Sequence, residues 1–313
     1  MRRALLGLVL LAASAAGAQS NVIRIVVPFA SGGVQDILAR SMNAELGTAL
    51  GRPVIVENRP GAGGTVGTAA VAKAAPDGTT LVLAAASHTI AGSLYSRLAY
   101  DPIADFTGVA HIGNVDYVLM VSSEVPSKSV REFIAHLKAN PGRFNYATAG
   151  NGSATHLAMA YFCGLAGVEM VHIPLKATGE AVNEVLAGRA HAVIAANIGA
   201  LPYAKDARVR MLGATGPARS KFLPELPAVA ESLPGYEFDS WIALLAPAAT
   251  PRPLVEQVNA AVAGLLKDPV ILGRLDKQGV VPQAMTPDGF ANLLRADFAK
   301  MARVVKISGA RID

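Results

Sequence analysis

Two short glycine turns hold the residues of this chain that are best suited to bind an anion. The first, Ser31-Gly32-Gly33, follows the apolar run 23–27, and the second is Gly150-Asn151-Gly152-Ser153. Each turn leads from an expected strand into an expected helix. The first N–H groups of a helix have no partner within it and lie at the positive end of its dipole. The pattern therefore indicates two carboxylate-binding turns, with ordinary structural turns as the alternative.

Strands and helices alternate around both turns, which is typical of α/β proteins. The expected strands are 23–27, 54–56, 80–86, 115–122, 145–147, 168–174, 190–195 and 210–214. The apolar spacing from Val34 to Leu50 predicts a helix after the first turn, and helices also follow the other glycine turns. In such sheets ligands bind beyond the carboxyl ends of the strands, and both turns lie at that edge.

The last third of the chain has a different composition. Prolines interrupt an extended region that contains Trp241, and helices are expected at about 253–266 and 287–307. A chain that builds one α/β lobe, builds a second and returns to the first makes two lobes with a cleft between them. We predict that 19–122 and 221–313 form lobe 1 and that 123–220 form lobe 2.

The first 18 residues have the pattern of a secretory signal peptide. Arg2 and Arg3 precede a 13-residue apolar run that ends in Ala16-Gly17-Ala18. Small residues at these positions predict cleavage after Ala18 and export to the periplasm. The apolar run is too short to span a membrane, and we expect the mature chain to be soluble.

Composition excludes several other classes of protein. Without Arg2 and Arg3 the chain has 26 basic and 23 acidic residues, with no basic block, so we expect no nucleic-acid partner. Cys163 is the only cysteine, which excludes an internal disulfide, and its apolar helical surroundings favour a structural role over a catalytic thiol. The six histidines lack metal-ligand spacing, so we predict no metal and no cofactor.

An enzyme is the less favoured reading of the same residues. The glycines of Gly61-Ala62-Gly63-Gly64 suggest a dinucleotide turn, but the spacing to Gly67 does not fit the usual fingerprint. The chain contains no Gly-x-Ser-x-Gly elbow, and no paired carboxylates stand at suitable turns. We therefore predict a binding protein rather than a catalyst.

Several motifs in order along the chain resemble one known family. They are Val27-Pro28-Phe29 through Gly32-Gly33-x-x-Asp36, Glu57 to Gly64, Pro76-Asp77-Gly78, Gly150 to Ser153 with His156, and Ala246-Pro247-x-x-x-Pro251. In this register the sequence closely resembles the tripartite tricarboxylate transporter substrate-binding family, also called the Bug family of periplasmic receptors. The resemblance covers essentially the whole mature chain.

The resemblance implies a periplasmic-binding-protein fold of the Venus-flytrap type (type II) that closes on one small solute. It also implies that backbone N–H groups and ordered water hold a carboxylate between the two glycine turns. Carried over, the first clamp would contain Phe29, Ala30, Gly32, Gly33 and Asp36, and the second Thr148, Gly150, Asn151, Gly152 and Ser153. Further candidates at neighbouring turns are Gln35, Ser87, His88, Lys176 and Thr178.

Asp36 and Lys176 each have an alternative role without ligand contact. Asp36 could brace the first turn, and Lys176 could be an ordinary surface lysine. Leu175 and Ala177 stand where the family usually has tyrosine and glycine, and Gln35 replaces a small hydroxyl residue. These departures predict a more apolar pocket. The expected partners are a small organic acid or amino acid and the membrane subunits of a transporter, and we expect a monomer. A sensor that signals to a membrane-bound kinase is the alternative function.

Overall fold

The computed structural model describes residues 22–310, so the expected signal peptide and its cleavage site lie outside the described residues. The strands are β1 (Ile23–Val27), β2 (Val54–Asn58), β3 (Thr80–Ala85), β4 (Phe106–Ser122), β5 (Asn145–Thr148), β6 (Val171–Pro174), β7 (Ala192–Ala196), β8 (Val209–Ala214), β9 (Asp239–Pro247) and β10 (Val280–Pro282). The α-helices are α1 (Val34–Arg40), α2 (Asn43–Leu50), α3 (Thr65–Ala72), α4 (Ser87–Leu94), α5 (Val130–Ala139), α6 (Ala154–Ala166), α7 (Thr178–Leu186), α8 (Asn197–Ala200), α9 (Arg252–Leu265), α10 (Pro269–Lys277) and α11 (Pro287–Ser308).

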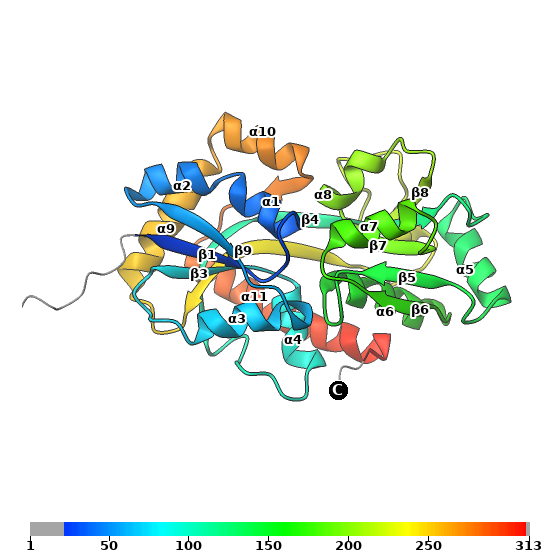
Figure 1. Cartoon of the computed structure of the whole chain (residues 1–313), viewed down its shortest axis with the longest axis horizontal. Helices are drawn as coiled ribbons and strands as arrows, with labels where there is room; N and C mark the ends of the chain where they lie inside the picture. Colours follow the sequence, from blue (N-terminus) through cyan, green and yellow to red (C-terminus); the bar gives the residue numbers. More distant parts are fainter. Residues whose placement is uncertain (1–21, 311–313) are drawn as a thin grey trace, which may run out of the picture.

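The strands form two α/β lobes that two long strands connect (Figure 1). In lobe 1, β1 pairs in parallel with both β2 and β3, and in lobe 2, β5 pairs in parallel with β6 and β7. The antiparallel strands β9 and β4 lie between these groups, in the order β2-β1-β3-β9-β4-β7-β5-β6. This arrangement is the two-lobed periplasmic-binding-protein fold that the sequence predicts.

The strand β4 passes from one lobe into the other. Its residues 106–116 pair with β9, whereas Tyr117 and the residues after it pair with β7 and β8. The returning segment lies beside this crossing, because Thr215 donates its N–H to the Tyr117 carbonyl (2.9 Å) and Phe238 donates to the Thr215 carbonyl (2.8 Å). We propose that the lobes divide at these crossings, between Asp116 and Tyr117 of β4 and close to Phe238 in the returning segment, so that the stretches just inside the predicted boundaries 122/123 and 220/221 belong to lobe 2.

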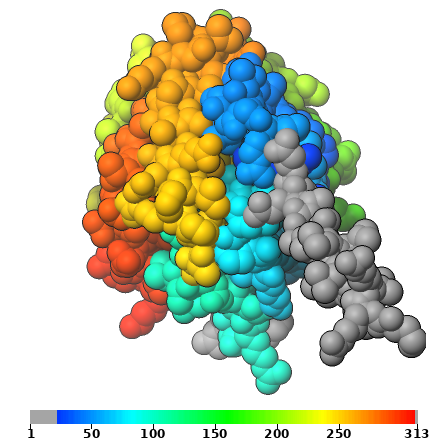
Figure 2. Space-filling view, turned by 90° about the vertical axis from the view of Figure 1, so that its left-hand side faces the viewer, coloured from blue at the N-terminus to red at the C-terminus, as the bar shows by residue number. Residues whose placement is uncertain are grey.

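The C-terminal helices complete lobe 1. Figure 2 shows residues of α9 and α10 (yellow and orange) against the N-terminal residues of α1 and α2 (blue). Arg274 of α10 connects them by donating to the Ser41 carbonyl (2.7 Å) and to the Glu45 carboxylate (2.6 Å). The last helix, α11, packs against α4 of lobe 1 and α6 of lobe 2, so it contacts both lobes.

Two local predictions need correction. The expected single helix from Val34 to Leu50 is two helices, because the chain leaves helical geometry at Met42 (φ −137°). The Ser41 hydroxyl donates to the Leu38 carbonyl (2.7 Å), which ends α1 with a local side-chain bond. The proline-rich last third also contains more regular structure than predicted, namely β9, α10 and β10.

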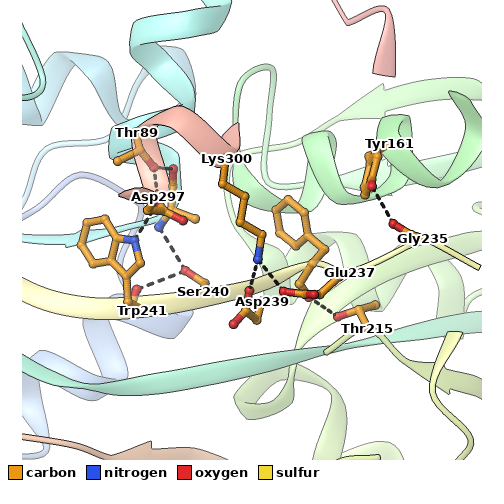
Figure 3. Close-up of polar contacts among 12 residues, drawn as sticks. Thr89, Tyr161, Thr215, Gly235, Glu237, Asp239, Ser240, Trp241, Asp297 and Lys300 are labelled. Carbon is orange, nitrogen blue, oxygen red and sulfur yellow. Dashed lines mark hydrogen bonds and ion pairs between the residues drawn. The ribbon is translucent and has the colours of Figure 1, made fainter. Parts of the chain in front are cut away.

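Trp241 lies in the core of lobe 1 rather than in the cleft, with 3% of its surface exposed. Figure 3 shows its ring beside Asp297 of α11. The Asp297 carboxylate accepts hydrogen bonds from the Trp241 indole Nε1–H (2.8 Å) and from the Thr89 hydroxyl (2.6 Å). One turn further along α11, Lys300 contacts Glu237 and Asp239, each at 2.8 Å. The helix α11 is thereby attached to the segment that returns from lobe 2.

Asp297→Ala is expected to lower the free energy of unfolding by about 1–3 kcal/mol, because the buried indole N–H loses its acceptor. Asp297→Asn keeps an acceptor oxygen in the same place and is the matched control, with a smaller expected loss. Urea denaturation of the three proteins measures the difference. Equal losses in both variants would show that the acceptor oxygen does not matter.

Candidate functional site

A cavity lies between the two lobes, where the carboxyl ends of the parallel strands meet the long strands β4 and β9. We call it the central cavity. The volume of this cavity is about 30 Å³, so it is small and closely surrounded by protein. It is lined by Phe29, Gly33, Val34, Gln35, Ala85, Ser87, Val115, Tyr117, Ala149, Ser153, Ala154, Thr155, Ala177, Thr178, Ala196, Ser240 and Ile242.

The lobes touch across one side of this cavity. The Tyr95 hydroxyl of lobe 1 lies 2.8 Å from the Ala62 carbonyl oxygen and 3.3 Å from the Asn151 carbonyl oxygen of lobe 2. A methyl group at Gly63 would collide with that Asn151 oxygen and would lie 3.0 Å from the Gly152 carbonyl carbon. The glycine turn 61–64 therefore meets the turn of lobe 2, and the structure is a closed form of the cleft.

The N-terminal ends of helices from both lobes face the central cavity. Lobe 1 contributes the first residues of α1, next to its N-cap Gly33, and of α4, at Ser87. Lobe 2 contributes the first residues of α6, next to its N-cap Ser153, and of α7, at Thr178. Because each helix start presents N–H groups and a partial positive charge, this arrangement favours a bound anion.

The lobe-2 turn, residues 148–153, is held by its own polar groups. The Ser153 hydroxyl accepts from the His156 N–H (3.2 Å), and the Thr155 hydroxyl accepts from the Ala149 N–H (2.8 Å). Gly150 and Gly152 have φ angles of +107° and +76°, which residues with a Cβ rarely adopt. The glycines are needed to bring the chain around into α6 with Ser153 as its cap.

Asp36 supports the first turn and does not line the central cavity. Its carboxylate accepts from the Gly32 N–H (2.8 Å) and from Arg40 Nε (2.8 Å). Burial opposes the charge, but the Gly32 N–H, the Asn58 amide and Arg40 together hold the pKa of Asp36 below its usual value. In this structure the side chain therefore acts as a brace for the loop.

The structure brings part of the predicted site together. Of the candidates, those that line the central cavity are Phe29, Gly33, Gln35, Ser87, Ser153 and Thr178. Those that line an adjoining groove of about 410 Å³ are Phe29, Gly150, Asn151 and Lys176. Those that line neither space are Ala30, Gly32, Asp36, His88, Thr148 and Gly152.

His88 needs a correction, because its ring turns into the core of lobe 1. The ring packs edge-on against Phe106 (4.8 Å between centroids), and its Nε2 lies 2.8 Å from the Pro102 carbonyl oxygen. Burial lowers the pKa of His88 to about 4. Ser87, one residue earlier, faces the central cavity instead.

The sequence did not indicate the residues of the two long strands that line the central cavity. Val115 and Tyr117 come from β4, and Ser240 and Ile242 come from β9. Burial raises the pKa of Tyr117 to about 12, so its hydroxyl keeps its proton and can donate to a ligand. These residues alternate along strands and carry no local motif, and only the pairing of β4 with β9 brings them together.

The central cavity has no lysine, arginine, histidine, aspartate or glutamate among its described lining residues. Within residues 22–310, no group of three or more His, Cys, Asp or Glu side chains could hold a metal ion. Burial raises the pKa of the Cys163 thiol to about 12, which disfavours a nucleophilic thiolate. The same residues include no helix with the length and apolar character of a membrane span.

Two α/β lobes closed on a small cavity that receives helix starts from both sides define a solute-binding protein. The chain matches the family model described as "Tripartite tricarboxylate transporter family receptor" over residues 38–310. The protein therefore belongs to the tripartite tricarboxylate transporter receptor family. This result confirms the family that the sequence motifs indicate.

Individual relatives agree with this assignment. The chain is 33% identical over 297 residues to protein BugT of Bordetella pertussis, covering 93% of this chain and 90% of BugT. It superposes on R. palustris Rpa4515, solved with adipate, with a TM-score of 0.88 and 31% identity, covering 95% of this chain and all of that one. MatC from Rhodopseudomonas palustris, with bound malate, gives a TM-score of 0.85 and 32% identity, covering 91% and 98%.

Proposed function

We propose that this protein binds one small organic carboxylate in the central cavity and delivers it to the membrane subunits of a tripartite tricarboxylate-type transporter. The observation that carries the proposal is the convergence of helix starts from both lobes on a cavity whose described lining has no charged side chain. Similar proteins hold adipate and malate, which are carboxylates. In this arrangement oriented backbone N–H groups and bridging water replace a fixed arginine.

The proposed ligand contacts come from both lobes. Gly33, Gln35 and Ser87 would act from lobe 1, and Ser153 and Thr178 from lobe 2, because these candidates line the central cavity. Apolar residues of the long strands would contact the carbon skeleton of the solute. Lys176 lines only the adjoining groove, so it would meet a second charged group of a longer solute.

A thermal-shift screen against small organic acids, including malate and adipate, and against uncharged solutes of similar size tests the proposal. A bound solute stabilises the protein by RT ln(1 + [L]/Kd), about 2.7 kcal/mol at a hundredfold excess over Kd. Hits are confirmed by calorimetry, and small-angle scattering should show a smaller radius of gyration in the bound protein. A panel in which only uncharged solutes bind would overturn the carboxylate assignment.

We further propose that the protein acts as a non-catalytic monomer in the periplasm after removal of residues 1–18. The exported chain is then expected to begin at Gln19, because the small residues before it suit signal peptidase. Intact-mass measurement of the protein from the periplasmic fraction checks this. A mass that includes Met1 in that fraction would contradict it.

A further inference from the structure

Three aromatic rings are stacked beneath the lobe-2 turn, and neither histidine among them lines the central cavity. His156 of α6 lies on His172 of β6 with 4.1 Å between ring centroids and 9° between ring planes. The ring of Tyr146 of β5 lies nearly parallel to both, with its centroid 5.0 Å from that of His172 and 6.5 Å from that of His156. The stack thus joins three elements of lobe 2 directly behind residues 148–153.

His156 is bonded to the lobe-2 turn at two points. The Gly152 N–H donates to its ring Nδ1 (3.2 Å), and its own N–H donates to the Ser153 hydroxyl (3.2 Å). These two bonds close the turn reciprocally, as a capping box does at other helix starts. A ring nitrogen can accept a hydrogen bond only when it carries no proton, so the ring must be neutral with its proton on Nε2.

The other end of the turn depends on the same stack. The Thr148 hydroxyl oxygen lies 2.6 Å from His172 Nε2 and accepts from the Gly150 N–H (3.1 Å). Gly150 and Gly152 lie between β5 and α6, and side-chain acceptors on Thr148 and His156 bind their N–H groups. The two histidines therefore fix the turn at residues 148 and 152.

The surroundings of the two rings keep them uncharged at neutral pH. Burial lowers the pKa of His156 to about 4. The pKa of His172 is also lowered to about 4, mainly by burial and to a smaller extent by the neighbouring His156 ring. The titratable groups that share a surface pocket with His156 are Tyr146 of β5, Cys163 of α6 and the exposed Glu169 before β6. Of the residues that the structure describes, Ser308 at the end of α11 and the following Gly309 and Ala310 also line that pocket.

We propose that His156 is a positioning residue for ligand binding, whose uncharged ring holds the lobe-2 turn, and that protonation of this ring releases the turn and weakens solute binding. The inference rests on the proposed role of the turn as half of the carboxylate site. A protonated ring presents N–H instead of a lone pair to the Gly152 N–H, so their hydrogen bond is lost. Because the protein binds the solute in the form with a neutral His156 ring, its affinity for the solute falls as the pH falls through the pKa of that ring.

The first test uses nuclear magnetic resonance of the ligand-free protein between pH 7 and pH 3. The His156 ring is expected to have an unprotonated Nδ1 at pH 7, and the Gly152 amide resonance should shift with the same midpoint as the ring. In His156→Asn the amide oxygen replaces Nδ1 without titrating, so this shift should disappear. A protonated Nδ1 at pH 7, or a Gly152 resonance that moves equally in His156→Asn, would overturn the proposal.

The second test is calorimetry with malate and adipate at pH values where circular dichroism shows each protein folded. At pH values below the pKa of the His156 ring, the affinity of the wild type should fall about tenfold per pH unit. This fall should come in addition to any loss of affinity that His156→Asn also shows. Protonation of the acid itself affects both proteins equally. His136→Gln on α5, away from the turn, should follow the wild type, and His156→Ala should bind more weakly already at pH 7.

These outcomes separate the inference from the proposed function. Binding with identical pH profiles in the wild type and His156→Asn would overturn the role of His156 and leave the carboxylate site intact. If neither acid binds at pH 7, the proposed ligand class loses support, and the resonance test alone decides whether His156 holds the turn.

Discussion

Gly63→Val is expected to weaken solute binding by about a hundredfold while both lobes stay folded. In the closed form a Cβ at Gly63 would collide with the backbone oxygen of Asn151 in the opposite lobe. A backbone oxygen cannot rotate away as a side chain can, so the lobes would have to stay apart. An open cleft loses the contacts from one of its lobes, and a shift of a two-state equilibrium by about 2.7 kcal/mol corresponds to a hundredfold change.

Gly51→Val is the matched control for this variant. Gly51 has the same φ of +63° as Gly63, but a Cβ there would meet no atom of a residue outside its immediate chain neighbourhood within 4 Å. Both variants share the cost of a side chain in the left-handed region, on the order of 1–2 kcal/mol. Only Gly63→Val should lose affinity in calorimetry and fail to compact in small-angle scattering. Normal affinity in Gly63→Val would show that the two turns do not meet in the bound state.

The sequence predicts the βα units and their glycine turns well, because these are local features. Strand, glycine and helix follow one another within about a dozen residues at both turns, and the N-caps lie at Gly33 and Ser153. Apolar periodicity and turn composition suffice for such units. The repetition of these units, followed by the different last third, then predicts two lobes.

The first half of β4 is not predictable in this way, because two glycines interrupt its strand pattern. A Cβ at Gly108 would lie 2.6 Å from the Phe290 ring, and one at Gly113 would collide with the Val281 carbonyl oxygen. Glycine is required there by close neighbours from α11 and β10, which are distant in the sequence. Because glycine has a low strand propensity, the sequence predicts a break in the strand at these positions. The close neighbours that require glycine there are visible only in the structure.

Only some of the predicted site residues line the central cavity, and the reason lies in the direction of individual side chains. Consecutive residues at a helix start point about 100° apart. Ser87 therefore faces the central cavity while His88 faces the core, and Gln35 faces it while Asp36 bonds to Gly32 and Arg40. The sequence marks the turn but does not show which residue of the first helical turn faces inward.

Converting the bound carboxylate into an amide is expected to cost at least about a hundredfold in affinity. Helix starts from both lobes place N–H donors and partial positive charge at the central cavity, and its described lining includes no charged side chain. An amide removes the negative charge that these groups stabilise, and its own NH₂ group faces other donors. Calorimetry at pH 7 with the tightest-binding acid and its amide measures the loss. Ser153→Ala should reduce the binding free energy of the acid by only about 1 kcal/mol, the value of one helix cap, because the backbone donors remain. Equal affinities for acid and amide would mean that shape, rather than charge at the helix starts, selects the solute.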